Sequence, residues 1–197
     1  MNQKHEDQIE HSHDERREQI KRAALKVFAR RGITGTKMSM IAAEAGISQG
    51  LSYRYFSSKE ELFTILVQEA MEEAQTAIKN AHQLPGTPSD QIRSLTINML
   101  DPDHKYVFLL LQQAQTSDDV PEQAKQLFEK YSPKDTIEQL IPLFQKGQQA
   151  GEFSAGDPYK LLFLYFSVIT GLMLQDMQMD EIDLLQEVDL FMKIITK

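Results

Sequence analysis

The sequence predicts an all-α protein, in which a three-helix amino-terminal domain precedes a larger helical domain, with about nine helices in total. Apolar residues recur at spacings of three and four along most of the 197-residue chain, and no segment alternates apolar and polar residues as a strand does. Glycine and proline clusters divide this pattern into segments of helical length. We therefore expect a tail over residues 1–13, a first domain over 14–60 and a second over 61–197.

The amino-terminal tail is polar and lacks apolar periodicity, so we expect it to be flexible. His5, His11 and His13 could bind a metal ion if they converged, but a flexible tail offers no scaffold to hold them. We expect no metal site there. The tail also lacks the apolar core of a secretory signal.

The first predicted helix starts near Asp14 and ends at Gly32, a good helix stop that directly follows two arginines. A shorter helix over 38–45 ends at Gly46. Ser48 is a natural N-cap for a third helix, which we expect to run to Tyr55 or Phe56. The apolar positions that should face inward are Ile20, Ala24, Val27, Phe28, Met38, Ile41, Ala42, Ala45 and Ile47.

A long fourth helix is predicted to open with a capping box formed by Ser58 and Glu61, and to continue to about His82. The segment LPGTPSD stops it. Helical patterns then continue over 90–100, 103–116, 121–131, 134–150, 158–177 and 180–195. These segments make up the larger domain.

Composition limits the class of protein. There is no cysteine, so disulfides, zinc thiolate sites and cysteine nucleophiles are excluded, which fits a reducing cytoplasm. No HExxH motif and no glycine-rich phosphate loop after a strand is present, so we expect neither an enzyme nor a cofactor. The most apolar run, 161–174, is shorter than the roughly 20 residues that a membrane span needs. A cytoplasmic protein without a membrane anchor is expected.

Charge is unevenly distributed along the chain. The formal net charge is −8, yet the segment from His13 to Lys59 holds ten cations and four anions. A basic segment on an acidic body is typical of a protein whose first part meets a polyanion. A solvated helix face is the alternative that charge alone leaves open.

The A-G-I-S stretch at 45–48 joins the second and third helices in the layout of a helix-turn-helix. In such a motif the glycine takes the sharp turn, and the helix after it enters the major groove of DNA. That helix should present small or hydrogen-bonding groups to base edges, with hydroxyls and cations at its flanks for phosphates. The nonapeptide SQGLSYRYF at 48–56 has this composition.

The stretch TKMSMIAAEAGISQGLSYRYFSSKEELF resembles the DNA-binding signature of TetR-type transcriptional repressors, with no insertion or deletion. The matching positions are Ile41, Ala42, Ala45, Gly46, Ser48, Gly50, Tyr53, Tyr55, Phe56, Lys59, Glu60 and Leu62. The motif covers roughly the first third of the chain. Ser52 departs from the apolar residue common at its position, which bears on the packing of the third helix.

The resemblance implies a role for each residue of the reading helix and its flanks. Gln49, Gly50, Leu51 and Arg54 would face the bases, with Ser39 able to reach them. Tyr53, Tyr55 and Lys59 would hold phosphates, although both tyrosines could also pack against the domain. Arg54 can form a fork on guanine, Gln49 can pair with adenine, and Leu51 can contact a thymine methyl. For Arg16 and Arg17, a contact to the DNA backbone and a solvated face remain open.

For the second domain the resemblance implies a dimerising receptor for a small hydrophobic effector. The last two helices carry more apolar residues than one helix stripe needs, so we expect them to form a homodimer seam; burial inside one monomer is the alternative. The effector would move the fourth helix and release a palindromic operator. Residues that could line its cavity, or be ordinary core, are Tyr106, Phe108, Phe128, Phe144, Met173 and Met177. A rival function is a helical protein-interaction adaptor that has kept the motif without binding DNA.

Overall fold

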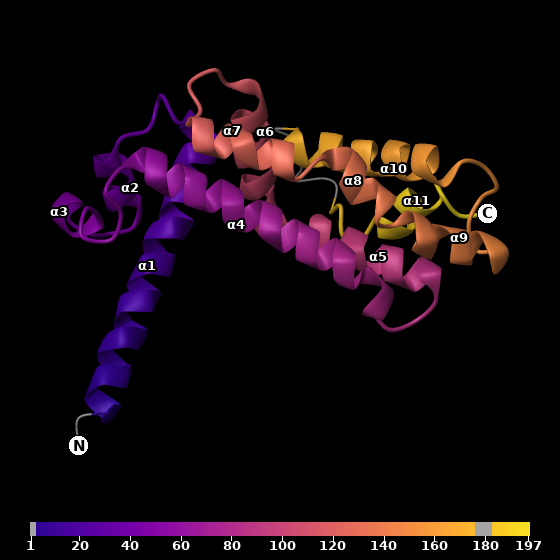
Figure 1. The fold of residues 1–197 in the computed structure, drawn as a ribbon, viewed down its shortest axis with the longest axis horizontal. Helices are drawn as coiled ribbons and strands as arrows, with labels where there is room; N and C mark the ends of the chain where they lie inside the picture. Colours follow the sequence, from indigo (N-terminus) through magenta and orange to yellow (C-terminus); the bar gives the residue numbers. More distant parts are fainter. Residues whose placement is uncertain (1–2, 176–182) are drawn as a thin grey trace. The chain divides into compact units, whose positions relative to one another are not determined.

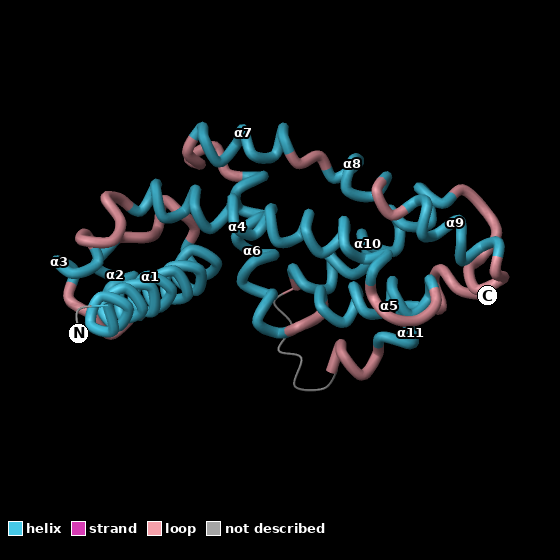
Figure 2. Tube along the Cα trace, turned by 60° about the horizontal axis from the view of Figure 1, so that its bottom comes forward, coloured by secondary structure: helices cyan, strands magenta, loops and turns pink. Residues whose placement is uncertain are grey.

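The computed structural model describes residues 3–175 and 183–197, and these residues form α-helices joined by short turns (Figures 1 and 2). The only extended pairing among them is one antiparallel bridge between Phe153 and Thr196. The all-α prediction is therefore confirmed. The chain divides into two compact units. Unit 1 comprises Met1–Glu69 and Leu110–Gln126, and unit 2 comprises Ala70–Leu109 and Leu127–Lys197.

Unit 1 contains the amino-terminal helices, the first part of α4, the end of α6 and the start of α7. The helix bounds are α1 Gln3–Arg31, α2 Met38–Glu44, α3 Gln49–Ser52, α4 Lys59–Asn80, α6 Lys105–Thr116 and α7 Glu122–Lys130. In Figure 1, α1 packs against α2, and α2 packs against α3.

The first helix begins at Gln3, well before the start near Asp14 that apolar periodicity predicts. Residues 3–13 contain no proline or glycine, and five of the eleven are glutamine, glutamate or lysine, which are good helix formers. Once the packed part of α1 is formed, each further residue extends the helix without a new nucleation cost. The helix can therefore begin before the apolar positions that periodicity marks.

The core of unit 1 is aromatic and aliphatic. The rings of Phe28 and Phe63 pack edge to face at 5.1 Å and 89°, a favourable geometry for an aromatic pair. Other apolar side chains that are fully buried come from α1, α2, α4, α6, α7 and the turn after α3: Ile20, Ala24, Ile41, Phe56, Leu62, Val67, Leu110 and Ala124. The inward-facing positions predicted from periodicity are buried, apart from Ile47, which is half-buried.

The turn between α2 and α3 has the geometry of a Schellman motif. Gly46 takes a φ of +66°, a region that glycine adopts without steric cost. The N–H of Ile47 donates to the Ala42 carbonyl at 2.9 Å, and the N–H of Gly46 donates to the Ala43 carbonyl at 3.1 Å. Ser48 then accepts the N–H of Leu51 at 3.2 Å and caps α3, as predicted.

Unit 2 contains the remaining helices, packed around one apolar core. The additional bounds are η1 Ala81–Gln83, α5 Pro88–Met99, η2 Pro102–His104, α8 Pro133–Glu138, α9 Ile141–Gln149, α10 Pro158–Leu174 and α11 Val188–Met192. Tyr165 is buried in this core, and its hydroxyl lies 2.7 Å from that of Thr96. Burial raises the pKa of Tyr165, while the bond to Thr96 opposes the shift. Of the residues considered for an effector cavity, Phe144 and Met173 belong to this core.

Two helices of unit 2 are shorter than predicted. The segment 134–150 is divided into α8 and α9, because Pro142 has no amide to donate within a continuous helix. In place of a helix over 180–195, α11 starts only at Val188. The Asp183 carboxylate accepts the N–H of Leu185 at 3.0 Å, a local bond that competes with helix formation. Residues 180–182 and Met177 lie outside the described residues.

No helix in the described part of the chain combines the length and the apolar character that a bilayer crossing requires.

Candidate nucleic-acid interface

The third helix and the turn after it present polar groups to solvent. Gln49, Gly50 and Arg54 are exposed, and Tyr53 exposes 49% of its surface in spite of its aromatic ring. A side chain at Gly50 would meet no atom within 4 Å, so the space in front of this helix is open. An exposed aromatic ring beside an amide and a guanidinium is a surface suited to polar ligands with flat edges.

The opposite face of the helix and the turn after it anchor it to the domain. Phe56 is 1% exposed, and Ser52 is completely buried. The Ser52 hydroxyl donates to the Gln49 carbonyl at 2.8 Å, so the buried polar atom is satisfied within the turn. This bond explains how a serine replaces an apolar residue at this position. Leu51 and Tyr55 are half-buried and lie between the two faces.

Ser39 and Lys59 flank the third helix in sequence. Ser39 is the second residue of α2 and is exposed. The Lys59 ammonium donates to the Ile33 carbonyl at 2.7 Å and to the Thr36 carbonyl at 2.9 Å. Both carbonyls lie in the loop between α1 and α2, so Lys59 fixes that loop. An ammonium has three donors, so one remains beyond these two bonds, and the Glu60 carboxylate lies 3.9 Å from the ammonium.

The start of α4 is capped by two serines. Ser58 accepts the N–H of Glu61 at 3.1 Å, as the predicted capping box requires. The reciprocal bond differs, because the Glu61 carboxylate accepts the N–H and the hydroxyl of Ser57 at 2.7 and 2.6 Å. These bonds from Ser57 lower the pKa of Glu61, and the charge of Arg17 contributes in the same direction.

Sequence patterns do not indicate the contacts that α1 makes with the residues on either side of α3. The Arg17 guanidinium lies 4.5 Å from the centre of the Phe56 ring, and its Nη1 donates to the Tyr55 carbonyl at 3.4 Å. Gln19 donates from Nε2 to the Ala45 carbonyl at 2.6 Å. No short-range pattern could have indicated these bonds, because they join residues 26 and 38 positions apart.

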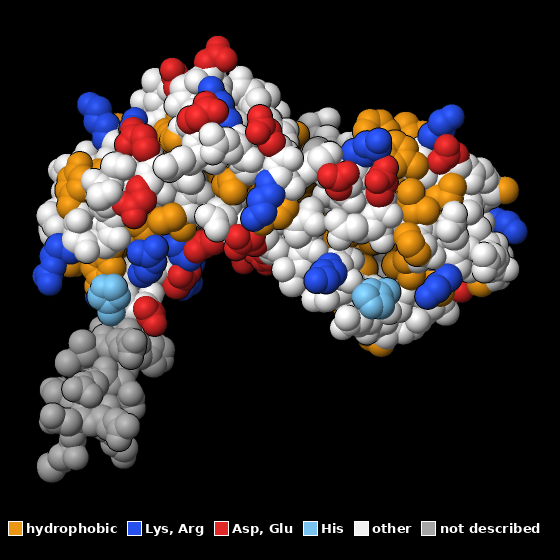
Figure 3. Space-filling view, viewed as in Figure 1, with side chains coloured by type: hydrophobic (Ala, Val, Ile, Leu, Met, Phe, Trp, Pro, Cys, Tyr) orange, Lys and Arg blue, Asp and Glu red, His pale blue; other side chains and the backbone are white. Residues whose placement is uncertain are grey.

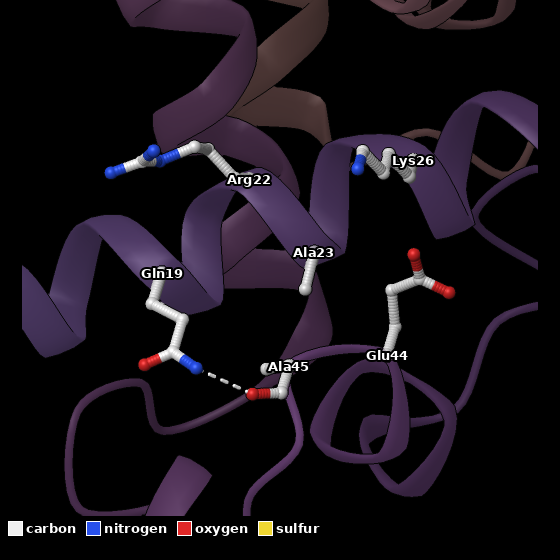
Figure 4. A pocket seen from close by; sticks show the side chains of 6 residues that line it. All are labelled: Gln19, Arg22, Ala23, Lys26, Glu44 and Ala45. Atoms are coloured by element: carbon white, nitrogen blue, oxygen red, sulfur yellow. Dashed lines mark hydrogen bonds between the residues drawn. The ribbon is translucent and has the colours of Figure 1, made fainter.

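A shallow hollow lies between α1 and α2 (Figure 4), and its lining is charged. Arg22 and Lys26 of α1 and Glu44 of α2 line it, and the Gln19–Ala45 hydrogen bond closes one side. Figure 3 shows that lysine and arginine side chains reach the surface of unit 1. Among the described residues, no group of three or more histidine or acidic side chains is arranged to hold a metal ion.

Comparison with known proteins places these features in a family context. The model of the family described as "Bacterial regulatory proteins, tetR family" matches residues 20–64, which include α2, α3 and the start of α4. The chain is similar to the HTH-type transcriptional regulator YfiR of Bacillus subtilis, with 28% identity over 78% of this chain and 75% of that protein. It is also similar to the HTH-type transcriptional activator FasR of Mycolicibacterium smegmatis, with 38% identity over 34% of this chain and 31% of the activator.

The fold has a close counterpart among solved structures. The ketosteroid transcriptional regulator KstR2 of Mycobacterium tuberculosis superposes with a TM-score of 0.74 at 20% identity, over 92% of this chain and 95% of the other. At this level of identity the likeness concerns the fold. The match extends through both units, whereas the family model covers only the amino-terminal helices.

Proposed function

The chain belongs to the TetR/AcrR family of transcriptional regulators, and from this premise we propose that it is a repressor that binds a palindromic operator as a homodimer. A small hydrophobic inducer releases it from DNA. The observation that carries the proposal is the segment formed by α3 and the turn after it, which holds Gln49, Gly50 and Arg54 in solvent while Ser52 and Phe56 anchor it. A helix anchored on one face can enter the major groove with the other.

Each exposed group has a partner on B-form DNA. Arg54 forms a bidentate pair with guanine, and Gln49 forms one with adenine. Leu51 contacts a thymine methyl, and Gly50 allows the backbone to approach the base edges. Ser39 reaches the same groove from α2.

Phosphate contacts fix the register of the reading helix. Tyr53 and Tyr55 bind phosphate oxygens through their hydroxyls, and Lys59 uses its remaining donor at the amino end of α4. The half-buried ring of Tyr55 packs against His13 at a centroid distance of 4.6 Å, which supports a fixed hydroxyl position.

The homodimer forms through the last two helices. Phe163, Leu164 and Val168 of α10 are 48%, 57% and 42% exposed, although they are apolar residues of a helix with a single charged side chain. Leu190 of α11 and Ile194 after it are likewise exposed. In Figure 3 apolar side chains reach the surface of unit 2. Covering such groups with a second copy is the usual origin of a two-fold interface.

The inducer would act through the segment 110–126. In unit 1, Gln113 Nε2 donates to the Ala29 carbonyl at 3.0 Å, and Thr34 donates to Asp119 at 2.8 Å. The Gln113 Oε1 is buried without a hydrogen-bond partner among the described atoms, and an unsatisfied acceptor of this kind is unfavourable.

A change in unit 2 reaches that contact along the chain. The helices α6 and α7 begin or end in unit 2, so a displacement there pulls on the segment. Inducer binding and DNA release are then reciprocal.

Selection of bound duplexes from a random DNA pool tests the proposal. The purified full-length chain should enrich an inverted repeat whose half-sites are about one helical turn apart. A reporter behind that sequence should then be silenced by the protein. Enrichment of no sequence at low salt, or a monomer at micromolar concentration, would contradict the proposal.

A further inference from the structure

Two side chains of α1 hold the third helix from both sides. Gln19 donates to the carbonyl of Ala45, which ends α2 just before the turn, and Arg17 donates to the carbonyl of Tyr55, which follows α3. Arg17 and Gln19 are two residues apart, whereas the two carbonyls are ten residues apart and enclose the whole reading segment. The end of a helix has carbonyl groups without partners in the helix itself, and such groups accept side-chain donors readily.

Neighbouring groups fix the donors in place. Arg16 donates to Gln19 Oε1 at 2.6 Å, which orients the Gln19 amide so that its NH₂ group faces Ala45. The Arg17 guanidinium lies over the ring of the buried Phe56 at 4.5 Å. One donor of the Arg17 guanidinium is used on the Tyr55 carbonyl and its flat face lies on the ring, so these two contacts join Arg17 to Tyr55 and Phe56, which both follow α3.

The third helix needs such support because it is only four residues long. A helix of this length has no stability of its own, since nucleation costs more than one turn of hydrogen bonds returns. Bidentate contacts with base edges tolerate displacements of only about 0.5 Å. The position of α3 must therefore come from groups outside it.

We propose that Arg17 and Gln19 are positioning residues for DNA reading, which set the place of α3 through the Tyr55 and Ala45 carbonyls and do not bind phosphate. The inference rests on the proposed DNA-binding function. Arg17 would thus hold α3 in place and would not contact the DNA backbone. A lysine at this position, which keeps the charge, should therefore not replace the arginine.

The test compares Arg17→Lys, Arg17→Met and Gln19→Met with the parent in the full-length protein. Affinity for the selected operator and for an unrelated duplex is measured by fluorescence anisotropy at several salt concentrations. We expect both Arg17 variants to bind the operator about tenfold more weakly, because each loses the planar donor and the ring contact. Affinity for the unrelated duplex should stay the same, and the salt slope of Arg17→Met should equal that of the parent.

Gln19→Met keeps the length of the side chain and removes its donor. It should lower the ratio of operator to non-operator affinity in the same way. Arg22→Met is the matched control, since Arg22 is an exposed cation of the same helix. We expect it to leave that ratio unchanged.

The opposite result is equally clear. If Arg17→Lys matched the parent and Arg17→Met reduced the salt slope by about 0.9, Arg17 would be a phosphate contact. Loss of specificity in Arg22→Met would also overturn the inference. If Arg17→Met failed to fold, the operator affinities of Arg17→Lys and Gln19→Met would still test whether these residues position α3. Failure of the proposed function is separate, because the parent itself would then show no preference for any duplex.

Discussion

Lys59 and Ile33 are joined by a hydrogen bond of 2.7 Å between the ammonium and the backbone carbonyl, although 26 positions separate them in the chain. Lys59 also donates to the Thr36 carbonyl at 2.9 Å, so it fixes the loop between α1 and α2 by two hydrogen bonds. A role in folding is thus combined with the proposed role at a phosphate.

Replacing Lys59 by alanine should affect both roles. Two carbonyls lose their donor, so we expect the free energy of unfolding to fall by about 1–3 kcal/mol in urea titrations. Binding to all duplexes should weaken, and the salt slope should drop by about 0.9. If the salt slope were unchanged while the stability fell, Lys59 would fix the loop between α1 and α2 but would not bind a phosphate.

Arg54→Ala should relax the choice of base at one position of each half-site. The loss of a bidentate guanine contact corresponds to about 1–3 kcal/mol of discrimination. Affinities for operators substituted at each position in turn provide the measurement. Should the variant discriminate among them as well as the parent does, Arg54 does not read a base.

Leu164→Glu should dissociate the homodimer. Leu164 is 57% exposed within one chain, so a carboxylate there is harmless to the protomer but is unfavourable inside an apolar seam. Sedimentation velocity should detect monomers that keep the helical content of the parent. Gln145→Glu, at an exposed position of α9, serves as the control for added charge and should remain dimeric.

Gly147→Ala should destabilise unit 2. A Cβ at this position would overlap the ring of Phe153 and would lie 3.1 Å from Pro88. The Phe153 ring is stacked on Phe144 with centroids 4.4 Å apart, so it has little room to move. We expect a loss of about 1–3 kcal/mol in urea titrations. Gly50→Ala meets nothing within 4 Å and should show no loss of stability.

Glu61→Gln should change how stability depends on pH. The pKa of Glu61 is lowered from its ordinary value of 4.5, chiefly by the bonds from Ser57, so the ionised carboxylate stabilises the fold above that value. This contribution is lost as the pH falls through the lowered folded-state pKa. The difference in unfolding free energy between parent and variant should therefore be largest near neutrality and shrink in acid.

Denaturation at a series of pH values measures that difference. Glu60→Gln is the matched control, because the Ser57 donors bond to Glu61 and not to its neighbour. If the difference in unfolding free energy between the parent and Glu61→Gln stayed constant from neutral to acid pH, ionisation of Glu61 would contribute nothing to stability.

Local chemistry made the helix-turn-helix predictable. Gly46 and Ser48 act within a few residues of their own position, so the turn and the cap of α3 follow from sequence. Pro142 is also a local signal, yet the periodicity of 134–150 outweighed it in the prediction of one helix. The early start of α1 was missed because a polar helix end has no apolar period.

Contacts between distant segments could not be predicted in the same way. Gln113 and Asp119 bond to residues of the amino-terminal helices, and nothing in their surroundings marks them as partners of Ala29 and Thr34. In the sequence, nothing distinguishes Arg17 from the other cations of the first helix, because its contact with the Phe56 ring depends on the fold. Such pairings depend on the packing of whole helices.

Segment 110–126 also determines where the chain can be cut. A fragment ending at Glu69 would lack Leu110, Ala114, Val120 and Ala124, all of which are buried in the intact chain. The amino-terminal helices therefore cannot be transferred alone to another protein. Chimeras with a different receptor body will need to transplant this insertion together with them.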